Sequence, residues 1–153
     1  MATKRKSLAE ITKRMIYLAS KNYKCSQIVM LLALEQENKE NSDLIKAISG
    51  LGDGCGFAKE SCGILTGSAC ILALHAGKGG EHEEQNEKLL PMLQELGEWF
   101  ESHIKGKYKS TKCNDIVGEL AGTPKGKKIC GSLLYDTYNK TNDILQAYGF
   151  VNN

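Results

Sequence analysis

Hydrophobic residues recur every three or four positions along most of the chain, which is the spacing of one face of an α-helix. The first such segment follows Ser7, and Ser7 and Glu10 together form a capping-box pattern. A second segment begins near Lys24 and closes in the polar run 35–41, and Ser42 caps a short third one. The N-terminal third therefore predicts three consecutive helices.

The middle of the chain combines a glycine-rich loop with a strongly apolar segment. Six glycines lie within residues 50–67, and glycine adopts backbone conformations that are closed to other residues. We expect a tight loop that opens into a helix over about 61–76. Gly63 and Gly67 lie four residues apart in this helix and give it a smooth face for close packing. This helix is predicted to be the central, most buried one.

Three more helical segments complete the pattern. An amphipathic stretch covers about 83–104, where Pro91 either kinks the helix or starts its better-formed half. Ser110 or Thr111 caps a short helix, and the last helix covers about 127–148. A turn of Gly122, Thr123, Pro124 and Gly126 separates these two helices.

The predicted fold is an all-α single domain over residues 1–153, a bundle of about six helices with residues 1–6 as a flexible basic tail. A chain of 153 residues with 41% hydrophobic residues can bury a core without disulfides. The net charge of +2 is too small to indicate the strongly basic surface that is typical of proteins that bind nucleic acid. No apolar run is long enough for a membrane span and no export signal is visible, so we expect a cytoplasmic location.

Cysteine content is the chemically informative feature of the composition. In a reducing compartment, six thiols point to metal ligation or catalytic redox chemistry rather than to structural disulfides. The six are Cys25, Cys55, Cys62, Cys70, Cys113 and Cys130.

Four of these thiols fall at or near predicted helix starts. Cys25, Cys62 and Cys113 open helices and Cys130 is placed in the first turn of the last helix, where the helix dipole favours a thiolate. The thiolate is both the nucleophile and the metal ligand. No Cys-x-x-Cys pair occurs, so a metal site must be assembled from distant segments.

The other two cysteines differ in their surroundings. Cys70 lies in an apolar run and is expected to fill the core. Cys55 lies between Gly54 and Gly56, where a ligand and an accessory thiol are equally compatible with the sequence.

The order of the cysteine blocks resembles the C-GCAxxG-C-C family of redox-active proteins, over roughly residues 8–140. The blocks surround Cys25, Cys62, Cys113 and Cys130, and the central one reads Ser-Cys-Gly where the family name has Gly-Cys-Ala. The resemblance implies that these four cysteines are the metal ligands, with Cys55 as a candidate substitute. The family is also similar to the non-haem part of split-Soret cytochromes, which implies an iron–sulfur centre. Covalent haem is not expected, because no Cys-x-x-Cys-His occurs.

The leading hypothesis is a redox-active protein that binds an iron–sulfur cluster or another thiolate-ligated metal for electron transfer. Gly54, Cys55, Gly56 and Gly63 would line the cofactor, with a redox protein as partner and a homodimer left open. No nucleic acid or membrane is expected as a partner. Two alternatives stay open, a metal-free dithiol/disulfide protein and a helical binding or scaffold module with incidental cysteines.

Overall fold

The computed structural model describes residues 4–152, and this part of the chain is all-α with no β-strand. The prediction of an all-α bundle is confirmed. The helices are α1 (Leu8–Ser20), α2 (Cys25–Gln36), α3 (Ser42–Ile48), α4 (Gly63–Ala76), α5 (Leu89–Ile104), α6 (Cys113–Ile116) and α7 (Pro124–Ala147). Single helical turns at Ser49–Leu51 and Gly118–Leu120 supplement them.

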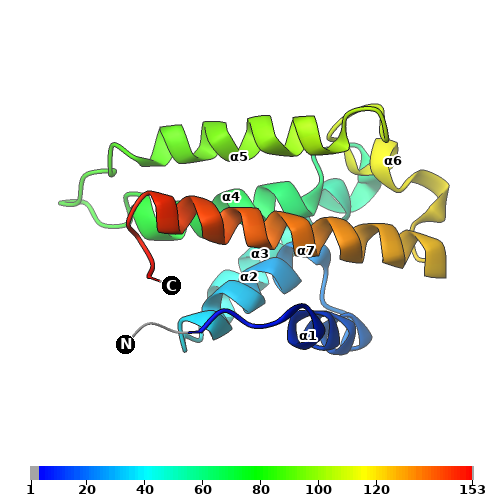
Figure 1. Cartoon of the computed structure of the whole chain (residues 1–153), viewed down its shortest axis with the longest axis horizontal. Coiled ribbons are helices and arrows are strands. Elements are labelled where there is room, and N and C mark those ends of the chain that lie inside the picture. Colours follow the sequence, from blue (N-terminus) through cyan, green and yellow to red (C-terminus); the bar gives the residue numbers. More distant parts are fainter. Residues whose placement is uncertain (1–3, 153) are drawn as a thin grey trace.

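Helix α4 lies at the centre of the bundle, as the sequence predicts, and packs against α2, α5 and α7 (Figure 1). Its small residues allow α2 to approach closely. A Cβ atom added to Gly67 would lie 2.9 Å from Val29 Cγ1 and 3.0 Å from the Ser26 carbonyl oxygen. Any larger residue at Gly67 would push the two helices apart.

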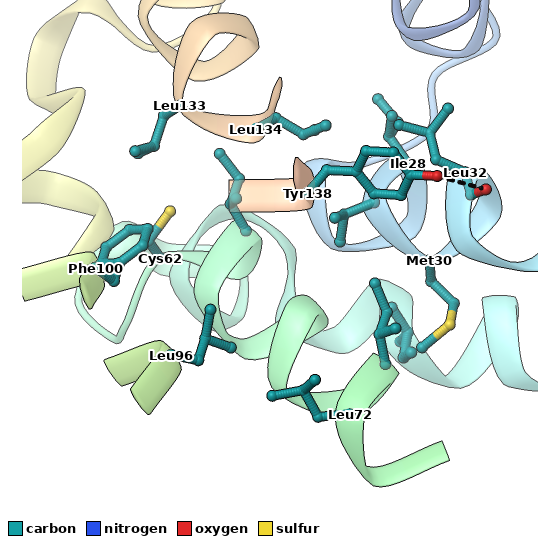
Figure 2. Close-up of a cluster of buried hydrophobic side chains, with 14 of the residues drawn as sticks. Ile28, Met30, Leu32, Cys62, Leu72, Leu96, Phe100, Leu133, Leu134 and Tyr138 are labelled. Atoms are coloured by element: carbon teal, nitrogen blue, oxygen red, sulfur yellow. Dashed lines mark hydrogen bonds between the residues drawn. The ribbon is translucent and has the colours of Figure 1, made fainter. Parts of the chain in front are cut away.

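Large apolar side chains from four helices form the core around α4 (Figure 2). Leu72, Leu96 and Phe100 are at most 1% exposed. The buried Tyr138 hydroxyl donates a hydrogen bond of 3.4 Å to the Leu32 carbonyl oxygen, which ties α7 to α2. Burial of each such side chain contributes about 1.5–3 kcal/mol to folding, so the core is the main source of stability.

Three helix starts differ from the sequence prediction. Helix α7 begins at Pro124 because Thr123 caps it by accepting a hydrogen bond of 3.1 Å from the Gly126 N–H. Cys130 therefore lies in the second turn of this helix and not in the first. Helix α5 begins at Leu89 with Pro91 in its first turn, and the N-cap of α6 is Lys112 rather than a serine or threonine.

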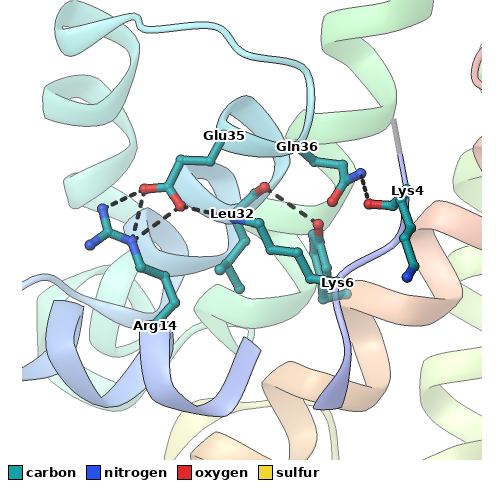
Figure 3. Close-up of polar contacts among 7 residues, drawn as sticks. Lys4, Lys6, Arg14, Leu32, Glu35 and Gln36 are labelled. Carbon is teal, nitrogen blue, oxygen red and sulfur yellow. Dashed lines mark hydrogen bonds and ion pairs between the residues drawn. The ribbon is translucent and has the colours of Figure 1, made fainter. Parts of the chain in front are cut away.

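The basic N-terminal segment is tied to the bundle at its described end (Figure 3). The Lys4 carbonyl oxygen accepts a hydrogen bond of 3.0 Å from the Gln36 side chain, and Lys6 pairs with Glu35 at 3.6 Å. Residues 1–3 of the predicted flexible tail lie outside the described residues.

Among the helices of residues 4–152, none has the length and apolar character that a bilayer crossing requires.

Candidate functional site

Two distant segments are joined at the start of α4 by an isolated antiparallel β-bridge. The Cys62 N–H donates to the Thr111 carbonyl oxygen at 2.8 Å, and the Cys113 N–H donates to the Glu60 carbonyl oxygen at 3.0 Å. Cys62 is the N-cap of α4 and Cys113 is the first residue of α6. These two hydrogen bonds hold the starts of both helices next to each other.

Two glycines make room for the sulfur-bearing residues. A Cβ atom on Gly63 would lie 2.8 Å from Cys25 Sγ and 2.8 Å from the Leu51 carbonyl oxygen. A Cβ atom on Gly54 would lie 2.8 Å from Cys113 Cβ. Glycine at both positions therefore allows the backbone to pass directly against Cys25 and Cys113.

All four cysteines implied by the family resemblance have a raised pKa, and burial is the largest cause in each case. Burial raises the pKa of Cys62 and of Cys130 to about 12, and it also raises the pKa of Cys25 and Cys113. At Cys62 the backbone N–H groups of Ile64 and Leu65 act in the opposite direction and lower the pKa. The expectation that the helix starts would favour thiolates overall is therefore wrong, because burial outweighs the helix dipole.

The four thiols lie within electrostatic reach of one another. After burial, a charge on Cys25 is the next cause of the raised pKa at Cys62, Cys113 and Cys130. Cys130 further raises the pKa of Cys62, and Cys113 raises that of Cys130. The structure thus brings together cysteines from four separate segments, and we name this set of four the thiol cluster.

Asp53 is a member of this site that sequence reasoning missed. Its backbone N–H lies against Cys25 and lowers the pKa of that thiol, whereas its carboxylate raises the pKa of Cys25, Cys113 and Cys130. Lys24 holds the carboxylate in an ion pair of 2.6 Å. The signal in the sequence was an acidic residue inside the glycine-rich loop, close to a cysteine.

The glycine-rich loop has an unusual left-handed turn. Four consecutive residues, from Asp53 to Gly56, have positive φ angles of 52°, 56°, 61° and 91°. For residues other than glycine, each such conformation costs about 1–2 kcal/mol. Backbone strain of this kind concentrates at functional sites, and here it lies beside the thiol cluster.

The other residues predicted for the site fall into two groups, those that border the thiol cluster and those that do not. Of the predicted cofactor-lining set, Gly54 and Gly63 contact cluster cysteines, whereas Cys55 is exposed and Gly56 borders open space. Cys70 is half-buried in α4 and packs against the core.

A single metal ion requires several ligand side chains within reach of one point. Within residues 4–152, no group of three or more histidine, cysteine, aspartate or glutamate side chains is close enough to hold one ion. The geometry of the described residues therefore does not by itself define a metal site at the thiol cluster.

Comparison with known proteins identifies the family. The model of the C_GCAxxG_C_C family, described as "Putative redox-active protein", matches residues 23–144. No curated protein and no solved structure gives a significant match. Because the family match covers most of the chain and includes the whole thiol cluster, the protein belongs to the C_GCAxxG_C_C family.

Proposed function

We propose that the thiol cluster holds an iron–sulfur cluster and that the protein transfers electrons. Cys25, Cys62, Cys113 and Cys130 would be the four ligands, because thiolates are the preferred ligands of such clusters. The family's redox character supports this assignment. An electron carrier also requires a redox protein that delivers or accepts the electron, which we propose as the partner.

The observation that carries the proposal is the convergence of four cysteines from four separate segments. The charge on Cys25 raises the pKa of each of the other three thiols, so all four belong to one region of the folded chain. Four cysteine thiolates are the usual ligands of both 2Fe–2S and 4Fe–4S clusters.

Burial of the thiols is consistent with this role. Cysteine must lose its proton to bind iron, and the positive charge of the metal then compensates the buried thiolate. The N–H groups of Ile64 and Leu65 face the Cys62 sulfur, and that of Asp53 faces the Cys25 sulfur. Hydrogen bonds to ligand sulfurs tune the reduction potential of such a centre.

Anaerobic isolation followed by iron and acid-labile sulfide analysis tests the proposal. We expect iron and sulfide in equal amounts and a visible absorption band that dithionite bleaches. A protein that is folded but contains no iron, both as isolated and after reconstitution with iron and sulfide, would exclude the cluster.

A dithiol/disulfide function is the second candidate. It is favoured by the backbone hydrogen bonds to Thr111 and Glu60 that hold Cys62 and Cys113 next to each other. In this case two thiols would be oxidised by an external disulfide, which is reduced to two thiols in exchange. Mass spectrometry after mild oxidation of the metal-free protein would detect a reversible bridge that Cys62→Ser abolishes. Absence of any bridge would leave the iron–sulfur proposal or a helical module with incidental cysteines.

A further inference from the structure

We infer that the cavity between α5 and α7 binds a small organic anion that carries a phosphate or carboxylate group. The cavity has a volume of about 400 Å³, which lies in the range of small-molecule sites. None of the six cysteines lines it. The inference is therefore independent of the proposed iron–sulfur function.

The cavity lies along one stripe of α7 and the C-terminal end of α5. Four lining residues of α7 are spaced three or four positions apart and so lie on one face of the helix. They are Lys125, Lys128, Ile129 and Ser132. The end of α5 and the residues after it, 103–108, form the opposite side.

Positive charge is concentrated at this cavity although the chain as a whole carries only +2. Lys107, Lys125 and Lys128 line it, and none of the three has an ion-pair partner among the described residues. The single carboxylate in the lining belongs to Asp136, which is bound to His103 Nε2 at 3.0 Å. Three unpaired lysines in a concave site attract an anion.

The rest of the lining suits an organic body rather than a bare inorganic ion. Ile104, Ile129 and Leu133 form an apolar wall, and Ser132 and Tyr108 bring hydroxyl groups. Specific small-molecule sites combine such apolar walls with a few polar groups that fix the orientation of the ligand. We therefore expect an anionic group held by the lysines and a compact ring or alkyl body against the wall.

The fluorescence of Trp99 can report binding at this site. Trp99 is the only tryptophan, and its ring stacks on the His103 ring at a centroid distance of 4.6 Å. Because His103 lines the cavity, a bound ligand changes the surroundings of the tryptophan. Its fluorescence and calorimetry together measure binding directly.

Phenyl phosphate and inorganic phosphate are the probes, since they share the anionic group and differ in the apolar ring. We expect saturable binding of phenyl phosphate, about tenfold tighter than that of inorganic phosphate because the ring is buried against the apolar wall. Equal affinities would overturn the inference of an organic ligand. No saturable binding of either probe would overturn the site altogether.

Two triple variants with the same change in net charge separate the cavity from general electrostatics. Lys107→Gln/Lys125→Gln/Lys128→Gln should weaken phenyl phosphate binding at least about tenfold, since close charges contribute most. The control, Lys46→Gln/Lys59→Gln/Lys78→Gln, should change it less than about twofold. Equal losses in both variants would overturn the site.

Circular dichroism of both variants checks that they fold. Poly-glutamate serves as a final probe: if it saturates the fluorescence change and phenyl phosphate does not, the lysines form a docking face for an acidic protein, and the small-molecule site is wrong.

Discussion

The core around α4 and the end of the bundle that carries the thiol cluster are built on opposite principles. In the core, regular helices bury large side chains such as Phe100 and Leu72, both 0% exposed. At the thiol cluster, helix starts, a single β-bridge and a left-handed turn bring backbone and sulfur together. The core stabilises the fold, whereas the strained backbone at the thiol cluster lowers the free energy of unfolding while it positions reactive groups.

The two regions also differ in what limits substitution. The core is filled by side chains, so the removal of atoms from them is costly. The thiol cluster is limited by backbone contacts at Gly54 and Gly63, so the addition of atoms is costly there. This difference predicts opposite responses to mutation in the two regions.

The largest effect on stability is expected in the core. Phe100→Ala should lower the free energy of unfolding by about 3–5 kcal/mol, because it leaves a cavity among fully buried side chains. Urea denaturation of the metal-free protein measures this, with the exposed Leu90→Ala as control at under about 0.5 kcal/mol. A loss of stability no larger than that of the control would contradict the tight packing of Phe100 in the core.

The next effect concerns the thiols themselves. In the metal-free, reduced protein at pH 8.5, Cys62 and Cys130 should react with iodoacetamide at least about 100-fold more slowly than the exposed Cys55, since only thiolates react. Peptide mass spectrometry resolves the order of alkylation. Equal rates at all sites would contradict the burial of the thiol cluster.

The same raised pKa values predict that the free energy of unfolding of the metal-free protein falls as the pH rises in the alkaline range. The neutral thiols of Cys62 and Cys130 stabilise the folded state below their ordinary pKa of 9.0, and this contribution is lost as the pH rises towards 12. The metal-free protein should therefore lose stability in this alkaline range. Cys62→Ser should flatten that loss compared with the wild type.

A smaller effect on stability is expected at the thiol cluster. Gly63→Ala should cost about 1–3 kcal/mol, because the methyl group meets Cys25 Sγ and a backbone oxygen. Gly97→Ala in α5 is the matched control, since nothing lies within 4 Å of its added Cβ. That substitution should stabilise the protein by up to about 1 kcal/mol. If both variants were stabilised, the close approach at Gly63 would be wrong.

The smallest predicted effect is a change in the alkylation rates of the cysteines that lie near the Asp53 carboxylate. Asp53→Asn should speed the alkylation of Cys25, Cys113 and Cys130 by about two- to fivefold, because removal of a nearby negative charge lowers their pKa. Asparagine tolerates the left-handed conformation, so the loop should persist. Cys62 is the internal control, because Asp53 is not among the largest causes of its raised pKa. An equal increase at Cys62 would indicate a general loosening of the loop.

Local patterns in the sequence were sufficient to predict most of the fold. The capping box of Ser7 and Glu10 and the smooth face of α4 are found as predicted. The sequence predicts a start of α7 near residue 127, which is three residues too late, because Thr123 and Pro124 fit a turn as well as a helix cap.

The site was less predictable than the fold. The resemblance implied the four cysteines, but their neutral state depends on burial, which no local pattern reports. The role of Asp53 depends on a left-handed turn that brings it to cysteines from three other segments. Such contacts between distant segments become visible only in the folded chain.

Iron content of single serine variants tests most directly whether these distant sulfurs form one site. After anaerobic reconstitution, serine at any one of the four cluster cysteines should remove most of the bound iron, whereas Cys55→Ser and Cys70→Ser should retain it. Circular dichroism of each variant shows that it is folded. Full iron retention in all four cluster variants, or loss of iron in Cys55→Ser alone, would contradict the account.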